Sequence, residues 1–366
     1  MNRQISLDVF RGLTLAAMLL VNNPGSWSQV YAPLLHASWH GLTPTDLIFP
    51  FFLFIVGAAM YYSMAKFAKS TEASTQHLPW LKILKRTTLL FFIGFLLNIY
   101  PFLEPATDWR IMGVLQRIAI CYGIAAILIC VLNLKQVLCC CVILLLGYWG
   151  LLNLVSLPYG LSSNLVKIVD VFILGKSHLY QGFGIAFEPE GILSCLPAIV
   201  TVLAGYLTSA MLNRYPSAKQ QCQLLILWGM MASLLGGFWH VLLPINKALW
   251  TSSYVLVTCG IAWLVLAVII YLHDIKQYKR WFNWAQIYGS NPLFIYVLAW
   301  LFAATLPLIH WQNNADQLVD VQGFVYQGLS AIMPAKLASL IFAVAFVALF
   351  YQLAKYLYQR KIFIKL

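Results

Sequence analysis

Apolar runs of about 20 residues recur from one end of this chain to the other, separated by shorter polar segments. A helix of about 20 residues crosses a hydrocarbon core of roughly 30 Å, so each run predicts a transmembrane helix. We therefore predict an all-α polytopic membrane protein with about ten spans, in which residues 1–366 form a single transmembrane domain. The predicted spans lie near residues 9–30, 46–66, 84–102, 112–132, 136–157, 191–212, 222–243, 249–272, 287–309 and 335–358.

The composition and the distribution of charge support this interpretation. Hydrophobic residues make up 61% of the chain and charged residues only 9%, against roughly 25% charged residues in an average soluble domain. If the spans are placed in this way, sixteen of the 23 lysines and arginines lie on the side of the membrane that holds the N-terminus, and five lie on the opposite side. Cytoplasmic loops carry such an excess, so we expect both termini in the cytoplasm. The net charge of +12 then lies beside anionic lipid headgroups, and we predict no nucleic-acid partner.

Groups that transfer protons near neutral pH gather on the predicted outer side, which holds five of the seven histidines and eight of the eleven acids. Any chemistry is therefore expected there. The eight cysteines lie in or beside spans, with no Cys-x-x-Cys pair and no histidine at metal-ligand spacing. We predict free thiols and no bound metal.

The first predicted span carries two ionisable residues, Asp8 and Arg11, three positions apart on one helix face. They form either a structural ion pair or a site where Arg11 binds an anionic group such as a phosphate, and both can hold at once. Asn22 follows, just before Pro24 and Gly25, which we expect to break the helix. Its amide either satisfies freed backbone groups or donates to a carbonyl oxygen or oxyanion.

Two histidines and a tryptophan, His36, Trp39 and His40, precede the second predicted span. Thr43 is the expected N-cap of that helix, and Asp46 stands in the third helical position of a capping box. Asp46 therefore has a structural explanation, and a second role, orienting a histidine, stays open beside it. A lone histidine in a loop is usually a polar surface residue. Two of them beside an asparagine and a carboxylate favour proton transfer.

These residues belong to motifs that resemble the heparan-alpha-glucosaminide N-acetyltransferase family, and the likeness extends over nearly the whole chain. The motifs are SLDVFRG at 6–12, the Val-Asn step at 21–22, HASWHGLT at 36–43, DLIFPFFLFIVG at 46–57, RIMGVLQR at 110–117, FEPEG at 187–191, PINKALWTSS at 244–253 and YGSNPL at 288–293. The resemblance implies transfer of an acetyl group from cytoplasmic acetyl-CoA to the amine of an amino sugar of the glucosamine type across the membrane. It also implies a homodimer, and the short chain is similar to bacterial relatives of the inner membrane.

The resemblance assigns the catalytic histidine to His36 and a functionally important asparagine to Asn22, and we add Asp46 as the residue that orients the histidine. For the donor we expect four cations, on the cytoplasmic side and in the fourth span: Arg11, Lys85, Arg86 and Arg117. Asp8, beside Arg11, is expected to belong to the same site. Arg117 has an alternative role, neutralising Glu188 or Glu190. For the acceptor we expect outer residues: Trp39, His40, Glu188 and Glu190.

Two alternative functions share these residues. One is an amino-sugar transporter, which would move its substrate without cleaving a thioester. The other is an O-acyltransferase acting on an envelope glycan, which would keep the donor site and change the acceptor. The sequence also leaves open whether the acetyl group passes directly to the amine or first to His36.

Overall fold

The computed structural model describes residues 5–69, 78–312 and 318–364. Within them the chain forms thirteen α-helices and one antiparallel pair of short strands, joined by 3₁₀ turns. The elements are α1 (Ile5–Asn22), α2 (Ile48–Ser63), α3 (Trp80–Ile99), α4 (Val114–Val131), α5 (Leu134–Leu152), α6 (Leu165–Leu174), α7 (Cys195–Arg214), α8 (Ala218–Trp239), α9 (Ser252–Ile270), α10 (Lys279–Tyr288), α11 (Pro292–Thr305), β1 (His310–Gln312), β2 (Leu318–Asp320), α12 (Val321–Ser330) and α13 (Ala335–Gln359).

The prediction of an all-α polytopic membrane protein is confirmed. Among the described residues, eight helices are long and apolar enough to cross a membrane: α1, α2 with the turn before it, α4, α5, α7, α8, α9 and α13. The bent pair α10 and α11 makes a ninth crossing if it is one span. The third predicted span corresponds to α3, which has 20 residues but carries Lys82, Lys85 and Arg86 in its first two turns. Each of the ten predicted spans therefore coincides with a helix or with the bent pair.

Two predicted boundaries are wrong. The first helix ends at Asn22 instead of near residue 30, because Pro24 cannot continue it. The ninth predicted span begins at residue 287, but α11 begins at Pro292, where it meets α10 at 65°. The helix α10 was not predicted, because its residues include Lys279, Arg280 and Asn283 and no apolar run marks it.

The break between α10 and α11 brings the two ends of the chain together. The Asn291 side chain donates to the carbonyl of Ile362 at 2.9 Å and accepts from the backbone N–H of Ile364 at 2.8 Å. From the other end of the chain, Arg11 reaches the carbonyl of Gly289 at 3.5 Å. Both described chain ends therefore lie at the same end of the helix bundle.

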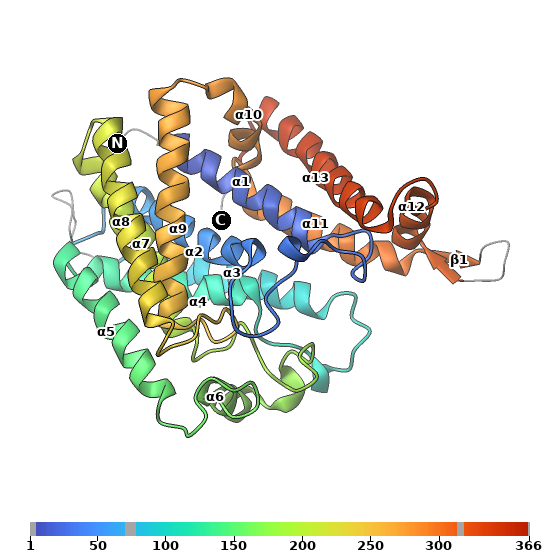
Figure 1. The fold of residues 1–366 in the computed structure, drawn as a ribbon, viewed down its shortest axis with the longest axis horizontal. Coiled ribbons are helices and arrows are strands. Elements are labelled where there is room, and N and C mark those ends of the chain that lie inside the picture. The colour runs from blue at the N-terminus through green and yellow to red at the C-terminus, as the bar shows by residue number, and fades with distance from the viewer. Residues whose placement is uncertain (1–4, 70–77, 313–317, 365–366) are drawn as a thin grey trace.

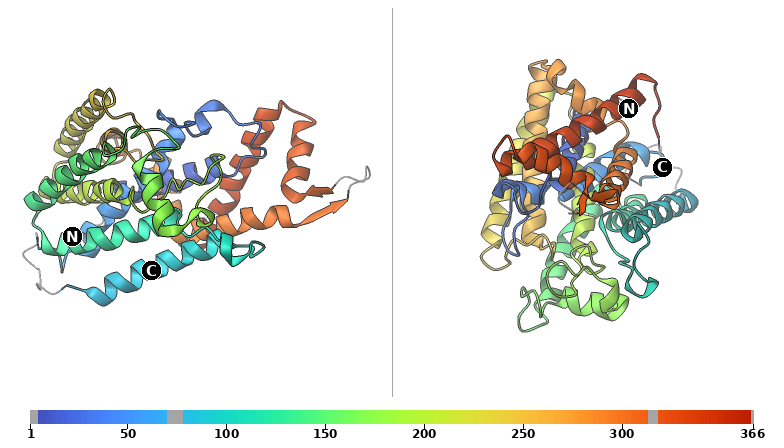
Figure 2. Two further views of the ribbon diagram at one scale, coloured as in Figure 1. Left: turned by 90° about the horizontal axis from the view of Figure 1, so that it is seen from below. Right: turned by 90° about the vertical axis from the view of Figure 1, so that its right-hand side faces the viewer.

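The helices pack as a bundle in which α7, α8 and α9 stand side by side (Figure 1). The neighbouring helices α3 and α4 run alongside one another, most clearly when the molecule is seen from below (Figure 2). The short helix α6 lies beyond the end of α5, while α12 and the strand pair project at another side of the bundle (Figure 1). The buried core includes large aromatic side chains, among them Trp250, Tyr254 and Phe54.

One of the tightest backbone contacts in this core joins α2 to α7. A Cβ atom at Gly57 would lie 1.7 Å from the carbonyl oxygen of Val202, and one at Gly205 would lie 1.8 Å from that of Phe54. Small residues allow helices to approach this closely in membranes. Since α2 carries Asp46 just before its start, this contact also fixes the position of the candidate site.

We predict that Gly57→Ala lowers the free energy of unfolding by about 1–3 kcal/mol, because the added methyl group meets backbone that cannot rotate away. The measurement is thermal denaturation of the detergent-purified protein. Gly147→Ala in α5 is the matched control, since a Cβ at Gly147 meets nothing within 4 Å. Equal melting temperatures for the two variants would contradict the packing described here.

Candidate functional site

A cavity of about 740 Å³ runs through the helix bundle. One end lies beside the two chain ends, where Phe363, Ile364 and the cations Arg11, Lys82 and Arg86 line it. The other end is lined by His36, Glu190 and Lys247, and the residues between are largely apolar. The cavity thus joins a group of positive charges at one end of the molecule to the predicted proton-transfer residues at the other.

At the end of the cavity away from the chain termini, His36 pairs with Asp46. Nδ1 of His36 lies 2.7 Å from Oδ1 of Asp46, and the two side chains are 50% and 1% exposed. Oδ2 of Asp46 accepts from the backbone N–H of Ala37 at 3.1 Å and of Thr43 at 3.0 Å, and from the Thr43 hydroxyl at 2.9 Å. Asp46 therefore closes the predicted capping box and also holds the histidine. With Nδ1–H donating to the carboxylate, Nε2 is the atom able to accept a proton.

Lys247 is a site residue that the sequence patterns did not single out. Its Nζ lies 3.0 Å and 3.2 Å from the two ring nitrogens of His36 and 3.7 Å from Oδ1 of Asp46. Burial lowers the pKa of Lys247, although Glu190 and Asp46 oppose that shift. The sequence placed Lys247 in a motif, but its contact with His36 spans 211 positions, which no local pattern reveals.

The loop that carries Lys247 is held by its own hydrogen bonds. The backbone N–H of Asn246 donates to the Thr251 hydroxyl at 3.1 Å, and the Asn246 amide oxygen accepts from the N–H of Leu249 at 2.8 Å. The N–H of Gly41 donates to the carbonyl of Ile245 at 2.8 Å, which ties this loop to the one bearing His36. Lys247 is therefore held in place at the cavity.

Trp39 and His40, predicted for the acceptor, lie behind the cavity wall. The Trp39 indole N–H donates to the carbonyl of Tyr159 at 2.8 Å, and its ring meets Phe187 edge-on at 5.3 Å. Nδ1 of His40 lies 3.3 Å from the Asn246 amide nitrogen. Burial, followed by the nearby His240, lowers the pKa of His40. Neither residue lines the cavity.

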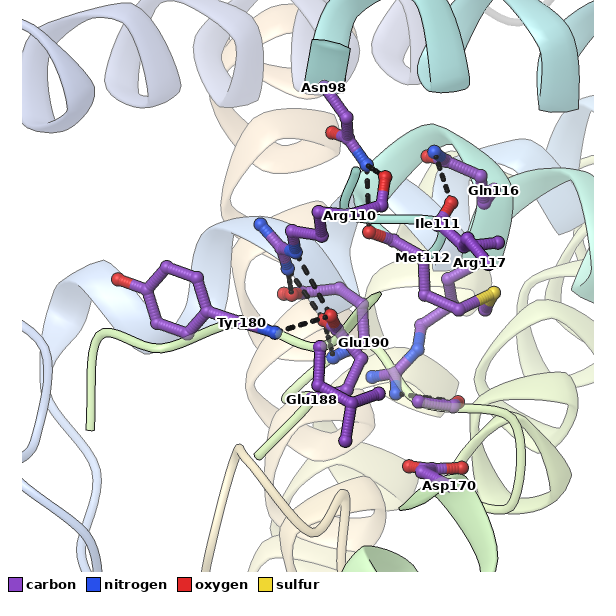
Figure 3. A network of polar contacts seen from close by, with 12 residues as sticks. Asn98, Arg110, Ile111, Met112, Gln116, Arg117, Asp170, Tyr180, Glu188 and Glu190 are labelled. Atoms are coloured by element: carbon purple, nitrogen blue, oxygen red, sulfur yellow. Dashed lines mark hydrogen bonds and ion pairs between the residues drawn. The ribbon is translucent and has the colours of Figure 1, made fainter. Parts of the chain in front are cut away.

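Arg110 binds both predicted glutamates (Figure 3). It donates to the two carboxylate oxygens of Glu188 at 2.9 Å and 2.5 Å, and to Glu190 at 2.8 Å. Glu188 is fully buried, whereas Glu190 lines the cavity. Burial pushes the pKa of Glu190 upward, but Arg110, Arg117 and Lys247 outweigh it, so the net pKa is lowered and the carboxylate stays charged.

The predicted donor-binding cations separate into two groups. Arg11 and Arg86 line the cavity, and Arg11 forms an ion pair of 2.9 Å with Asp8, which also lines it. Lys85 is exposed on α3 away from the cavity, whereas Lys82, four residues before Arg86 and so on the same helix face, lines it. The prediction from sequence thus named Lys85 and missed Lys82.

Arg117 is fully buried and lies outside the cavity lining. It donates to the carbonyl of Gly191 at 3.3 Å and to the hydroxyl of Ser194, and its guanidinium lies 4.8 Å from the centre of the Trp250 ring. These contacts brace the turn that carries Glu188 and Glu190, whereas the ion pairs to the two glutamates come from Arg110. Among the described residues, no group of three or more histidines, cysteines or acids could hold a metal ion.

Fold and site together define a polytopic membrane protein whose internal cavity joins cations at one end to a histidine–aspartate pair at the other. A family model described as heparan-alpha-glucosaminide N-acetyltransferase, catalytic, matches residues 3–235, and the chain belongs to this family. It is 28% identical to the heparan-alpha-glucosaminide N-acetyltransferase of Homo sapiens over 376 aligned positions, and 28% identical to that of Mus musculus over 357. The alignments cover 85% and 81% of this chain but 55% and 53% of the relatives, so it spans about half their length.

Asp170 of α6 lies below the Glu188–Gly191 turn, outside the spans (Figure 3). Its Oδ1 accepts from the N–H groups of Ile192 at 2.9 Å and Leu193 at 3.4 Å, while its buried Oδ2 has no partner within the part of the chain that the structure describes. Burial raises the pKa of Asp170 to about 6 from the ordinary 3.8, although the two N–H groups oppose the shift. Compared with the unfolded chain, the folded protein therefore favours the protonated form of Asp170.

We predict that stability falls as pH rises from about 4 through about 6, since above that range the folded protein holds a buried charge that the unfolded chain solvates. The loss is on the order of 2–3 kcal/mol. Asp170→Asn, which keeps one acceptor oxygen and cannot ionise, should flatten this part of the curve. Melting temperatures from pH 4 to pH 8 would show it, with exposed Asp108→Asn as control. A wild-type slope that persists in Asp170→Asn would contradict the assignment.

Proposed function

We propose that this protein transfers an acetyl group from cytoplasmic acetyl-CoA to the amine of a glucosamine-type amino sugar on the other side of a bacterial inner membrane. The observation that carries the proposal is the single cavity that joins Arg11, Lys82 and Arg86 to His36. The end with the chain termini is the cytoplasmic end, because most lysines and arginines fall on that side of the predicted spans.

The donor fits the cavity in one orientation. The phosphates of CoA bind the three cations at the cytoplasmic end, where guanidinium groups suit phosphate oxygens. Asp8 holds Arg11 in place through their ion pair of 2.9 Å. The apolar middle of the cavity accommodates the extended arm of the cofactor, which brings the thioester to Asn22 and His36 at the outer end.

The reaction follows from the geometry of the outer end. The Asn22 amide, which makes no hydrogen bond to any residue that the structure describes, donates to the thioester carbonyl oxygen. Nε2 of His36 takes a proton from the attacking amine as the C–N bond forms. The C–S bond then breaks, and the thiolate of CoA receives the proton from His36. Asp46 fixes the tautomer, and Lys247 lies against the ring nitrogens of the imidazole.

His36→Ala should lower the rate of acetyl transfer from radiolabelled acetyl-CoA to glucosamine by at least about 100-fold, because general acid–base catalysis contributes roughly 10²–10⁴. His310→Ala, at an exposed histidine of the same predicted side, is the matched control and should retain the wild-type rate. Unchanged transfer by His36→Ala would end the catalytic assignment. Uptake of glucosamine into proteoliposomes without acetyl-CoA, with no CoA released, would instead favour the transporter.

Lys247→Met should lower the rate of acetyl transfer about tenfold, because it removes an ammonium group that lies 3.0 Å and 3.2 Å from the ring nitrogens of His36. Lys247→Arg keeps the charge and should retain more of the wild-type rate. The measurement is transfer from radiolabelled acetyl-CoA to glucosamine. A wild-type rate in Lys247→Met would contradict a role for Lys247 at the histidine.

A further inference from the structure

A second cavity of about 460 Å³ lies beside the first, between α1, α11 and α13. The two cavities have four lining residues in common: Met18, Asn22, Val114 and Tyr296. The second cavity therefore begins at the asparagine that we place on the thioester carbonyl.

Its lining is apolar and uncharged. Trp300, Ala304, Phe342 and Phe346 form much of the wall, and none of the described residues that line it is charged. The polar exceptions, besides Asn22, are Asn23 and Gln322.

Those two amides are already engaged by the backbone. The Asn23 side chain donates to the carbonyl of Leu19 at 2.8 Å, and Gln322 donates to that of Pro24 at 2.9 Å. A sugar ring needs several polar partners, and the ammonium form of an amino sugar needs a nearby acid. This cavity supplies neither, which argues against the acceptor as its occupant.

A hydrocarbon chain would bind favourably against these apolar residues, because transfer of each CH₂ group from water to an apolar surface lowers the free energy. The methyl group of acetyl fills only a small part of the space. We propose that the second cavity binds the acyl chain of the donor, so that the protein also uses acyl-CoA donors longer than acetyl-CoA. This inference rests on the proposed acyl transfer.

The bond changes are those of acetyl transfer. The amine nitrogen forms a bond to the carbonyl carbon, the C–S bond breaks, and the proton passes from the amine through His36 to the thiolate. Only the acyl chain attached to the carbonyl carbon differs. In the proposed complex it extends past Asn22 toward Tyr296 and Trp300, into the second cavity.

The direct test compares acetyl-, butanoyl-, hexanoyl- and octanoyl-CoA as donors to glucosamine with the wild-type protein. We expect KM for the donor to fall with chain length, by up to about fourfold for each added CH₂, and octanoyl-CoA to match or exceed acetyl-CoA in kcat/KM. Use of acetyl-CoA together with a more than 100-fold lower kcat/KM for every longer donor would overturn the inference alone. Failure of every donor would instead overturn the proposed function.

Ala304→Phe narrows the second cavity and should lower the ratio of octanoyl to acetyl transfer at least tenfold. Ala345→Phe, the same change at an exposed position of α13 outside both cavities, should leave that ratio unchanged. An equal loss with both donors, accompanied by a higher KM for glucosamine, would place the acceptor in the cavity and overturn the inference. If Ala304→Phe does not fold, thermal stabilisation of the wild type decides: octanoyl-CoA should stabilise more than acetyl-CoA, and equal stabilisation would contradict the proposal.

Discussion

The hydrogen bond between His36 and Asp46 is the interaction on which the rest of the site depends. A carboxylate that is 1% exposed is unfavourable by several kcal/mol unless hydrogen bonds compensate, and here the imidazole, two backbone N–H groups and the Thr43 hydroxyl do so. The residue that starts the second span is therefore also the residue that orients the candidate base. Because α2 packs against α7 through backbone contact at Gly57 and Gly205, the helix bundle itself sets where His36 meets the cavity.

Acidic and basic side chains surround the end of the cavity that holds His36. Three acids, Asp46, Glu188 and Glu190, lie among three cations, Arg110, Arg117 and Lys247. Arg110 joins the two glutamates, Arg117 braces their turn from behind, and Lys247 faces the histidine.

The sequence predicted what local patterns determine. The length of the apolar runs located the helices, and the spacing of Thr43 and Asp46 correctly indicated a capping box. The patterns did not reveal contacts between distant segments: Lys247 lies 211 positions from His36, and Lys82 became a candidate only once α3 was placed against the cavity. The helix α10 was missed because it is polar and precedes the apolar run of the ninth predicted span, and its bend against α11 is held by backbone of the distant C-terminal segment. Trp39 and His40 stand next to His36 in the sequence, yet their side chains turn into the wall.

The most direct test of the proposed donor path is a structure of the protein determined by electron cryomicroscopy with coenzyme A bound. We expect phosphate density against Arg11, Lys82 and Arg86, with the sulfur end extending through the cavity to Asn22 and His36. Coenzyme A bound outside this cavity, or with its sulfur at the cytoplasmic end, would contradict that path.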